Sequence, residues 1–339
     1  MTRELATVDT ILELRPIPGA DAIECAVIRG WECVVKKGAH QVGDAVVFFE
    51  IDSVLPEEPR YEFLRKGCYS AHMNGFRIRT MKLRGQVSQG LALPTKEVFP
   101  ELQRHDHLVG ADVTELLKVR LYEPPSAGQG APGKPFPLGI PKTDEDRVQN
   151  VFARLPTDAL WDVTEKLDGS SMTVFVTPEA RGVCSRNLER PEEDSCNFWR
   201  AARTQNLIAE CERICADNPE LFGEGIVLQG ELLAPGIQKN RYGVAAPRFY
   251  VFSVLRCRGS VLWERLSPGE TMDLCFSYGL EMVPVIACLP SQESVKAWVE
   301  LAKGKSELNA ATTREGLVVR TPQQSFKVIN PDFLLEHGE

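Results

Sequence analysis

A lysine enclosed by acidic residues stands in the run Glu165-Lys166-Leu167-Asp168-Gly169. The segments Trp161 to Glu165 and Met172 to Val176 are rich in β-forming residues, so we expect the lysine at the end of a strand, beside a glycine turn. A lysine amine is a nucleophile only when it is unprotonated. Because the pKa of a free lysine is about 10.4, neighbouring groups or a metal ion must depress it. A pattern this short also occurs by chance in many proteins, so at this point a nucleophilic lysine and an ordinary charged residue both stay open.

Five further polar motifs follow this lysine in order, each beside an apolar β-like run. They are Ser185-Arg186-Asn187, Gln229-Gly230-Glu231-Leu232, Phe249-Tyr250-Val251-Phe252, the run from Arg314 to Arg320, and the run from Ser325 to Asn330. No G-x-G-x-x-G or Walker P-loop accompanies them, which excludes the Rossmann and P-loop interpretations. The ordered set resembles the covalent nucleotidyltransferase superfamily, which contains DNA ligases, RNA ligases and mRNA capping enzymes. The resemblance covers essentially all of residues 144–330.

The resemblance implies a catalytic role for several polar groups. Lys166 would attack the α-phosphate of ATP and carry AMP through a phosphoramidate bond. Lys327 would spread the charge that develops on the phosphate oxygens. The three acids that would hold the hydrated shell of Mg²⁺ or Mn²⁺ are Asp168, Glu231 and Glu315.

The same resemblance implies further nucleotide contacts. Phe252 would stack on adenine, and Glu165 would accept a hydrogen bond from the adenine amino group. Arg186 would contact phosphate, and Gly169 belongs to the same nucleotide-binding set. The reaction would continue in two steps, in which AMP passes to a 5′-phosphate end and a 3′-hydroxyl then attacks that end and releases AMP.

Two segments resemble RNA ligases more than DNA ligases. One is the phrase Glu-Lys-Leu-Asp-Gly-Ser-Ser at residues 165–171, and the other is the segment from Lys142 to Asn150 that precedes the lysine strand. Within the second, Arg147 is interpreted either as a phosphate contact or as part of a charge cluster at a helix start.

Short strands joined by turns fill the first 115 or so residues, with β-rich runs at Trp31 to Lys36, Ala45 to Ile51 and Phe76 to Leu83. Such spacing predicts a small β-barrel. The last motif lies close to Glu339, so a barrel is expected at the N-terminus. That order resembles the small fifth family of RNA ligases, whose OB domain precedes the catalytic domain.

The expected fold class is therefore α+β, an OB-type barrel joined to a nucleotidyltransferase domain of antiparallel sheets flanked by helices. The expected domains are an OB-fold nucleic-acid-binding domain at 1–118, a Pro/Gly-rich linker without regular structure at 119–143, and the nucleotidyltransferase domain at 144–339.

Four cations lie close together in the barrel sequence without an acid among them. They are Arg77, Arg79, Lys82 and Arg84. They indicate either a groove that follows a phosphate backbone or a solvated strand face, with Arg77 and Arg79 on one side of a single strand. The family acts on breaks with 3′-hydroxyl and 5′-phosphate ends, often nicks in duplexes, with RNA at the 3′-hydroxyl side. RNA, or a nicked duplex that contains it, is therefore the expected partner.

Two positions depart from the usual motifs. Ile329 stands where many ligases carry a second lysine, and Ser253 stands where an acid is common. Lys239 or Arg241 is a candidate to supply the missing positive charge. The replacement of the acid by Ser253 has no explanation in the sequence.

The composition limits the other possibilities. A net charge of −8 argues against a protein that coats nucleic acid by bulk attraction. The ten cysteines form no C-x-x-C pair, and we find no secretory signal or apolar membrane span, so a cytoplasmic monomer with reduced thiols is expected. The alternatives that stay open are a DNA ligase, a GTP-dependent capping-type nucleotidyltransferase, and a non-catalytic OB-type nucleic-acid-binding protein.

Overall fold

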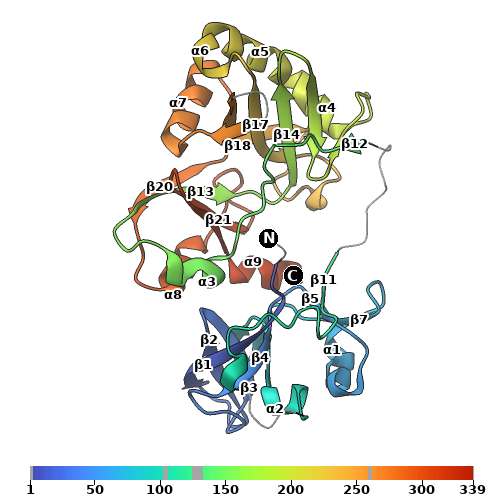
Figure 1. Cartoon of the computed structure of the whole chain (residues 1–339), viewed down its shortest axis with the longest axis vertical. Coiled ribbons are helices and arrows are strands. Elements are labelled where there is room, and N and C mark those ends of the chain that lie inside the picture. The colour runs from blue at the N-terminus through green and yellow to red at the C-terminus, as the bar shows by residue number, and fades with distance from the viewer. Residues whose placement is uncertain (1–2, 102–105, 124–132, 259–261, 339) are drawn as a thin grey trace. The chain divides into compact units, whose positions relative to one another are not determined.

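The computed structural model describes residues 3–101, 106–123, 133–258 and 262–338 (Figure 1). The chain divides into two compact units. The first comprises Met1–Ala127 together with Pro331–Glu339, and the second comprises Gly128–Asn330. The last helix, α9 (Pro331–His337), is thus counted with the first unit, whereas the sequence placed it in the C-terminal domain.

The first unit is built on a curled five-stranded antiparallel sheet. Its strands, in sheet order, are β10 (Leu91–Pro94), β4 (Ala45–Phe49), β1 (Ala6–Pro16), β2 (Ile23–Ile28) and β3 (Trp31–Lys36). The first half of β1 pairs with β4 and the second half with β2, and the register shifts between Ile11 and Glu13. An extra residue bends a strand and increases its twist. This bulge therefore lets β1 pair with β4 in its first half and with β2 in its second half, and it curls the sheet.

A second sheet completes this unit and corrects one expectation. Its order is β11 (Arg120–Leu121), β5 (Ser53–Leu55), β7 (Gly75–Arg77) and β6 (Tyr69–Ser70). The expected single strand from Phe76 to Leu83 is wrong, because β7 ends at Arg77 and a separate hairpin follows, β8 (Met81–Leu83) and β9 (Gln86–Ser88). The hairpin turn has positive φ at Arg84 and Gly85, the geometry that matches the twist of two antiparallel strands.

The helices of this unit are short, and they lie beside an apolar core. They are η1 (Pro59–Leu64), α1 (Arg65–Cys68), α2 (Thr95–Val98) and η2 (Asp106–Leu108). The core brings together β1, β4, β5 and β7 through side chains such as Val8, Val47, Leu55 and Phe76.

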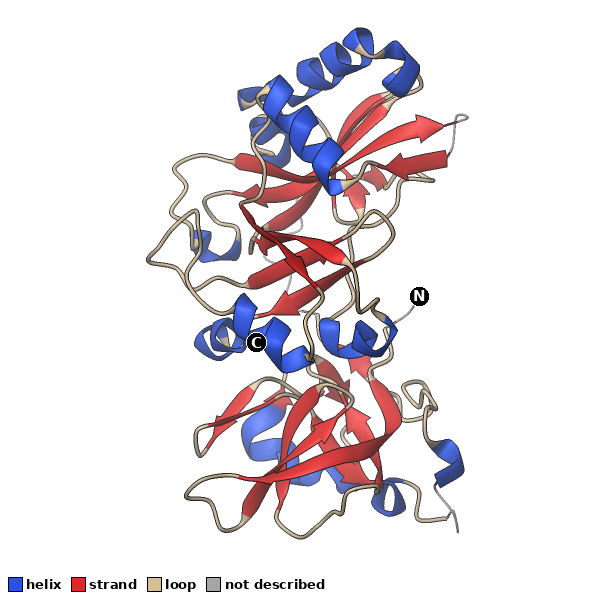
Figure 2. Cartoon of the chain, turned by 90° about the vertical axis from the view of Figure 1, so that its left-hand side faces the viewer, coloured by secondary structure: helices blue, strands red, loops and turns tan. Residues whose placement is uncertain are grey.

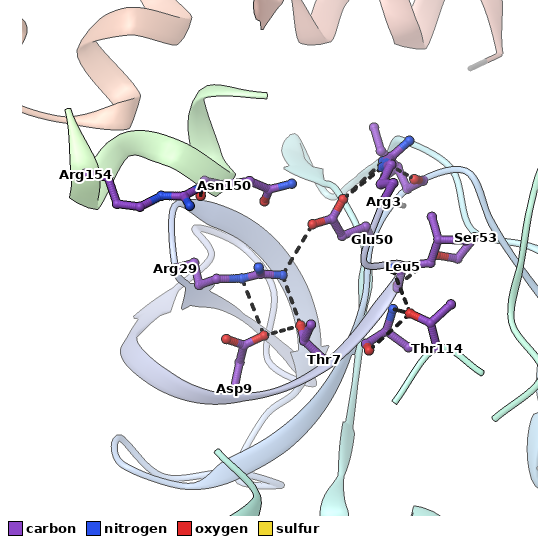
Figure 3. A network of polar contacts seen from close by, with 12 residues as sticks. Arg3, Leu5, Thr7, Asp9, Arg29, Glu50, Ser53, Thr114, Asn150 and Arg154 are labelled. Atoms are coloured by element: carbon purple, nitrogen blue, oxygen red, sulfur yellow. Dashed lines mark hydrogen bonds and ion pairs between the residues drawn. The ribbon is translucent and has the colours of Figure 1, made fainter. Parts of the chain in front are cut away.

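A buried carboxylate ties the strands of the first unit together (Figure 3). Glu50 is only 1% exposed and lies between two arginines, with Oε2 3.1 Å from Arg3 Nη2 and Oε1 3.3 Å from Arg29 Nη2. Arg29 also contacts Asp9 at 3.4 Å and donates to Thr7 Oγ1 at 3.1 Å. The segment before β1, the β2–β3 turn and the end of β4 are thereby joined through one charge.

The second unit contains two antiparallel sheets. The larger has the order β12 (Lys134–Pro135), β16 (Leu188–Glu189), β15 (Arg181–Ser185), β14 (Ser170–Val176), β17 (Ile226–Leu233), β18 (Arg248–Arg258) and β19 (Leu262–Arg265). The smaller has the order β20 (Val285–Pro290), β13 (Leu160–Lys166), β21 (Gly316–Arg320) and β22 (Ser325–Ile329). The turn from β13 to β14 joins the two sheets directly.

Helices cover one face of the larger sheet (Figures 1 and 2). They are α4 (Asn197–Thr204), α5 (Leu207–Asp217), α6 (Pro219–Phe222) and α7 (Pro268–Tyr278), and their apolar side chains share a core with β14, β17 and β18. The smaller sheet packs on α3 (Val148–Val151) and α8 (Val295–Ala302). In the described part of the chain, no helix has the length and apolar character needed to cross a membrane.

Two further expectations need correction. The apolar spacing from Asn197 to Ala216 predicts a single amphipathic helix. The structure has two helices there, because Asn206 adopts a left-handed conformation with φ of 52° between α4 and α5. The linker expected at 119–143 contains the two short strands β11 and β12, which pair with β5 and β16. Its residues 124–132 lie outside the described part of the chain, and the domain boundaries themselves remain predictions.

Replacing Glu50 with glutamine should destabilise the first unit. The substitution keeps the shape of the side chain but leaves Arg3 and Arg29 without their shared counter-charge. We expect a loss of about 2–3 kcal/mol, less than the ~3–5 kcal/mol of a fully buried pair, because both arginines still reach solvent. Urea unfolding measures this loss in the free energy of unfolding.

Glu62→Gln, which breaks an exposed pair with Arg65, is the control and should leave the free energy of unfolding unchanged. Equal effects of the two substitutions would contradict the role given to Glu50.

Candidate active site

Lys166 is the last residue of β13, and the alternation of that strand decides which way it faces. Trp161 and Val163 belong to the apolar core beneath the smaller sheet, so Lys166 lies on the opposite face. Lys327 pairs with Val318, which in turn pairs with Thr164, two residues before Lys166. Lys166 and Lys327 therefore share one face of the sheet.

At Gly316, the first residue of β21, the neighbouring strand β22 comes unusually close. Gly316 pairs with Lys166 on one side and with Ile329 on the other. A Cβ atom at this glycine would lie 2.2 Å from the carbonyl oxygen of Val328. Only glycine fits at this position, and Ile329 lies in the same register row as Lys166, where a second lysine was anticipated.

Lys166 forms an ion pair with Glu315. Its Nζ lies 2.7 Å from Oε1 and 2.8 Å from Oε2 of that carboxylate. Burial lowers the pKa of Lys166, but the carboxylates of Glu315 and Glu231 raise it by more, so that it stands above its ordinary value. The amine is therefore held as an ammonium group until something else engages these carboxylates.

Glu231 and Gly169 connect the lysine turn to the larger sheet. The Gly169 amide donates to Glu231 Oε1 at 3.0 Å, and a Cβ at Gly169 would lie 2.4 Å from the Leu232 carbonyl oxygen. Burial raises the pKa of Glu231 to about 8, although Lys166 opposes the shift. The absence of a side chain at Gly169 is what lets β14 and β17 bring Glu231 beside Lys166.

Asp168 is held by two neighbouring residues of one loop. Its buried carboxylate forms an ion pair with Arg241, and its amide donates to the Tyr242 hydroxyl at 2.8 Å. Arg241, suggested by the sequence as a substitute for the missing lysine, thus pairs with Asp168. The Arg241 carbonyl in turn accepts a hydrogen bond from Thr312 Oγ1 at 2.7 Å.

The turn before Arg241 has an uncommon backbone. Gln238, Lys239 and Asn240 have φ values of 44°, 56° and 50°, so three consecutive non-glycine residues are left-handed. The side-chain amide of Asn240 exchanges two hydrogen bonds with the backbone of Val244, each at 3.0 Å. Lys239 itself is exposed, and the turn directs Arg241 and Tyr242 toward Asp168.

Phe252 is the extra residue of a bulge in β18. Gln229 pairs with Ser253 and Gly230 pairs with Val251, which leaves Phe252 without a partner opposite it. Bulges redirect a side chain, and here the ring is half-buried beside Leu167 and Tyr242. The guanidinium of Arg320, from the smaller sheet, lies 5.3 Å from the ring centroid. Ser253 is buried in the sheet opposite Gln229, and nothing in the structure explains why it stands in place of an acid.

The segment 142–147, which we call the strap, contacts both sheets. On the larger sheet, Asp144 lies 2.5 Å from Arg186 Nη2 in an exposed ion pair. On the smaller sheet, the Asp146 carbonyl accepts from the Lys327 amide at 2.7 Å, and Arg147 forms a bridge with Lys327. Arg186, Arg147 and Lys327 are thus tied to one short segment.

Glu165 points away from this face. It is 1% exposed, and its Oε2 accepts from the Glu307 amide at 2.8 Å. Burial raises its pKa, while the Ser306 hydroxyl opposes the shift. Its Oε1 is buried and has no hydrogen-bond partner among the described residues, so one acceptor of this carboxylate is left unused.

The four barrel cations differ in their contacts and exposure. Arg77 pairs with Asp52 at 3.0 Å and lies 3.7 Å from the Tyr122 ring centroid, which makes it part of the packing of the first unit. Arg79 donates to the Gly67 carbonyl at 3.0 Å. Lys82 and Arg84 are exposed at the β8–β9 hairpin. The alternation predicted for this run is present, since Phe76 and Ile78 are buried while Arg77 is half-buried and Arg79 is exposed, although β7 itself ends at Arg77.

The acids near Lys166 do not form a metal cage of their own. Within the described ranges, no three His, Cys, Asp or Glu side chains are placed to hold an ion together. Mg²⁺ usually keeps several waters and binds through one or two carboxylates plus substrate phosphates. Glu231 and Glu315 fit a hydrated ion that arrives with a nucleotide.

The sequence had assigned no role to Tyr242, Glu145 or Arg320. Arg320 ends the last strand motif before Ser325 and Tyr242 follows Arg241, so both were adjacent to residues already singled out. Nothing in the sequence indicated which partner each would meet.

Comparisons with known proteins agree with this geometry. A family model for RNA ligase matches residues 160–331, and a model for an OB-fold domain matches residues 5–95. A solved structure of a mutant Naegleria gruberi RNA ligase with AMP and Mn is 36% identical, with 99% of each chain covered and a TM-score of 0.88. The chain belongs to the RNA ligase family.

Further Naegleria gruberi RNA ligase structures support the assignment. The one with PPi is 37% identical over 99% of each chain, with a TM-score of 0.87. A mutant with ATP and Mn is 36% identical over 98% of this chain and 99% of that one, also with a TM-score of 0.87. No curated protein sequence matches the ligase. The expected fold class, an OB domain followed by the catalytic domain, is confirmed.

Glu231→Gln should remove a pH dependence of the ligase's stability. The folded pKa of about 8 lies above the ordinary 4.5, so the folded chain keeps this proton to higher pH than the unfolded chain. The free energy of unfolding of the wild type, relative to the variant, should therefore fall as pH rises from 5 to 8. The slope should stay below ~1.4 kcal/mol per pH unit. Urea unfolding at several pH values measures it, and parallel curves would contradict the assigned environment.

Proposed function

We propose that the protein is an ATP-dependent RNA ligase that acts through a lysyl-AMP intermediate on Lys166. The observation that carries this proposal is the placement of the Lys166 amine within 2.8 Å of Glu315, on the sheet face it shares with Lys327 and beside Glu231. An amine among carboxylates, with cations close by, suits attack on a phosphate that arrives with a divalent ion. The Naegleria ligase structures with ATP, AMP and Mn support the choice of cofactor.

Each residue then has a defined task. Lys166 forms the bond to the α-phosphorus, and pyrophosphate leaves. Lys327 and Arg186 contact phosphate oxygens, with Arg186 exchanging its exposed pair with Asp144 for the nucleotide at little cost. Phe252 stacks on adenine. Glu165 Oε1 accepts a hydrogen bond from the adenine amino group. Gly169 belongs to the turn at the nucleotide.

A divalent cation, Mg²⁺ or Mn²⁺, accompanies ATP in this proposal. Bound there, it would favour the neutral amine and offset the phosphate charge. Glu231 and Glu315 would accept hydrogen bonds from its water shell. Asp168, already paired with Arg241, would contribute through water at most. Engagement of Glu315 by this shell would free Lys166 of the charge that raises its pKa.

The proposed substrate class rests on the resemblance to the fifth family of RNA ligases. We propose that residues 1–118 form a nucleic-acid-binding OB domain, that 119–143 is a linker, and that 144–339 is the nucleotidyltransferase domain. The proposed substrates are 3′-hydroxyl/5′-phosphate nicks in duplexes with RNA at the 3′-hydroxyl side, in RNA repair. Lys82, Arg84 and Arg79 are the barrel cations most available for phosphates, and Arg147 would act near the nick. A cytoplasmic, monomeric enzyme remains the expectation.

Lysine adenylylation is the first test. Purified protein with α-labelled ATP and Mg²⁺ or Mn²⁺ should acquire label that survives denaturation, whereas Lys166→Ala should acquire none. Lys303→Ala, which removes an exposed lysine paired with Glu300, is the control and should be labelled like wild type. Label on Lys166→Ala would show that another residue is the nucleophile. Label from GTP alone would favour the capping-type alternative, and no label from either nucleotide, with pre-bound AMP excluded, would favour the binding protein.

Sealing of defined nicks tests the substrate. A nick with ribonucleotides at the 3′-hydroxyl side should be sealed at least about tenfold faster than an all-DNA nick, because the 2′-hydroxyl is the group that separates the two. A nick with RNA only at the 5′-phosphate side controls for general RNA affinity and should behave like DNA. Equal sealing of all three would favour the DNA ligase alternative.

A further inference from the structure

We propose that Glu145 is a positioning residue for the adenine site, and that it acts through Arg320 on the ring of Phe252. The inference rests on the proposed function, in which Phe252 stacks on the base of ATP. It assigns Glu145 and Arg320 to base placement and not to contact with the reacting phosphate.

Glu145 and Arg320 form a nearly buried ion pair. Arg320 Nη2 lies 3.2 Å from Glu145 Oε1, and the two side chains are 9% and 12% exposed. Burial lowers the pKa of Arg320, and the Glu145 carboxylate opposes that shift. A buried cation that loses its counter-ion is strongly disfavoured and moves or recruits water. The place of the guanidinium therefore depends on the charge of Glu145.

Glu145 is itself fixed from several directions. Its Oε2 accepts from Ser325 Oγ at 2.6 Å. Its neighbours in the strap are tied to both sheets, Asp144 to Arg186 and the Asp146 carbonyl to the Lys327 amide. Glu145 is thus held where its carboxylate meets the guanidinium of Arg320.

Arg320, on the smaller sheet, contacts the Phe252 ring on the larger sheet. Its guanidinium lies 5.3 Å from the centroid of the Phe252 ring, a cation–π distance. Because Phe252 is the unpaired residue of a bulge, no residue opposite it in the ladder fixes its side chain. The contact with Arg320 is a cross-sheet restraint on the ring. Arg320 also donates to Thr164 Oγ1 at 3.4 Å, two residues before Lys166. Losing the contact with the ring should weaken the stacking interaction, while the hydrogen bonds of Glu315 and Glu231 beside Lys166 lose no direct partner.

The test is a split between nucleotide affinity and the rate of adenylylation. Glu145→Gln should raise the KM for ATP in lysyl-AMP formation about fivefold to tenfold, and raise the inhibition constant of adenosine equally, because the base is affected. The kcat should stay within about twofold. Glu264→Gln is the matched control, since it also breaks arginine pairs, with Arg256 and Arg258, but at an exposed site. It should change neither constant.

A double-mutant cycle separates action through Arg320 from a general structural effect. Arg320→Met should raise the KM for ATP on its own, and adding Glu145→Gln should then have no further effect on KM. Ser325→Ala, which removes only one hydrogen bond to Glu145, should shift KM in the same direction by less and serves if Glu145→Gln does not fold.

Three outcomes would overturn the inference: an unchanged KM in folded Glu145→Gln or Ser325→Ala, additive effects in the cycle, or a loss confined to ATP with adenosine binding intact. Each presupposes a wild type that forms lysyl-AMP. A wild type that does not react would overturn the proposed function first, and the two failures are thereby distinguished.

Discussion

The ion pair between Lys166 and Glu315 is the interaction on which the catalytic unit depends. It forms because β13 ends at Lys166, and β21, which begins directly after Glu315, pairs with β13 there. Gly316 lets β22 approach β21 closely on the other side. The pair is also a constraint on chemistry, since it holds the amine in its unreactive, charged form. Any ligand that makes the lysine reactive must therefore compete for Glu315 as well as bring the phosphate.

Charge in this protein is organised by pairing arginines with buried acids. Arg241 is matched with Asp168, Arg320 with Glu145, and two arginines with Glu50 in the first unit. These pairs connect strands that are distant in sequence. An acidic chain can thus place positive charge beside phosphates while most of its arginines have structural partners. The pair of Arg186 with Asp144 is exposed, which suits exchange of Asp144 for a substrate phosphate.

The sequence located strands and motif residues better than it located their contacts. β3 matches the expected run Trp31 to Lys36 to the residue, and β21 lies within the motif from Arg314 to Arg320, because β-branched and apolar side chains mark both strands. The breaks at Asn206 and after Arg77 were missed, since each depends on a single backbone conformation that nearby composition does not reveal. The partners of Asp168 and Phe252 were missed for a different reason. They are set by strand register and by contacts between sheets, which one sequence does not encode in any local pattern.

The left-handed turn before Arg241 has a consequence for how this enzyme can change. Three consecutive non-glycine residues with positive φ hold a conformation that costs about 1–2 kcal/mol each for most side chains, less for Asn240. Glycine at Gln238 or Lys239 would relieve that cost and yield a more heat-resistant protein. It would also hold Arg241 and Tyr242 less firmly in their contacts with Asp168, in the turn beside Lys166. Selection for thermal tolerance and selection for turnover would therefore favour opposite residues at the same two positions.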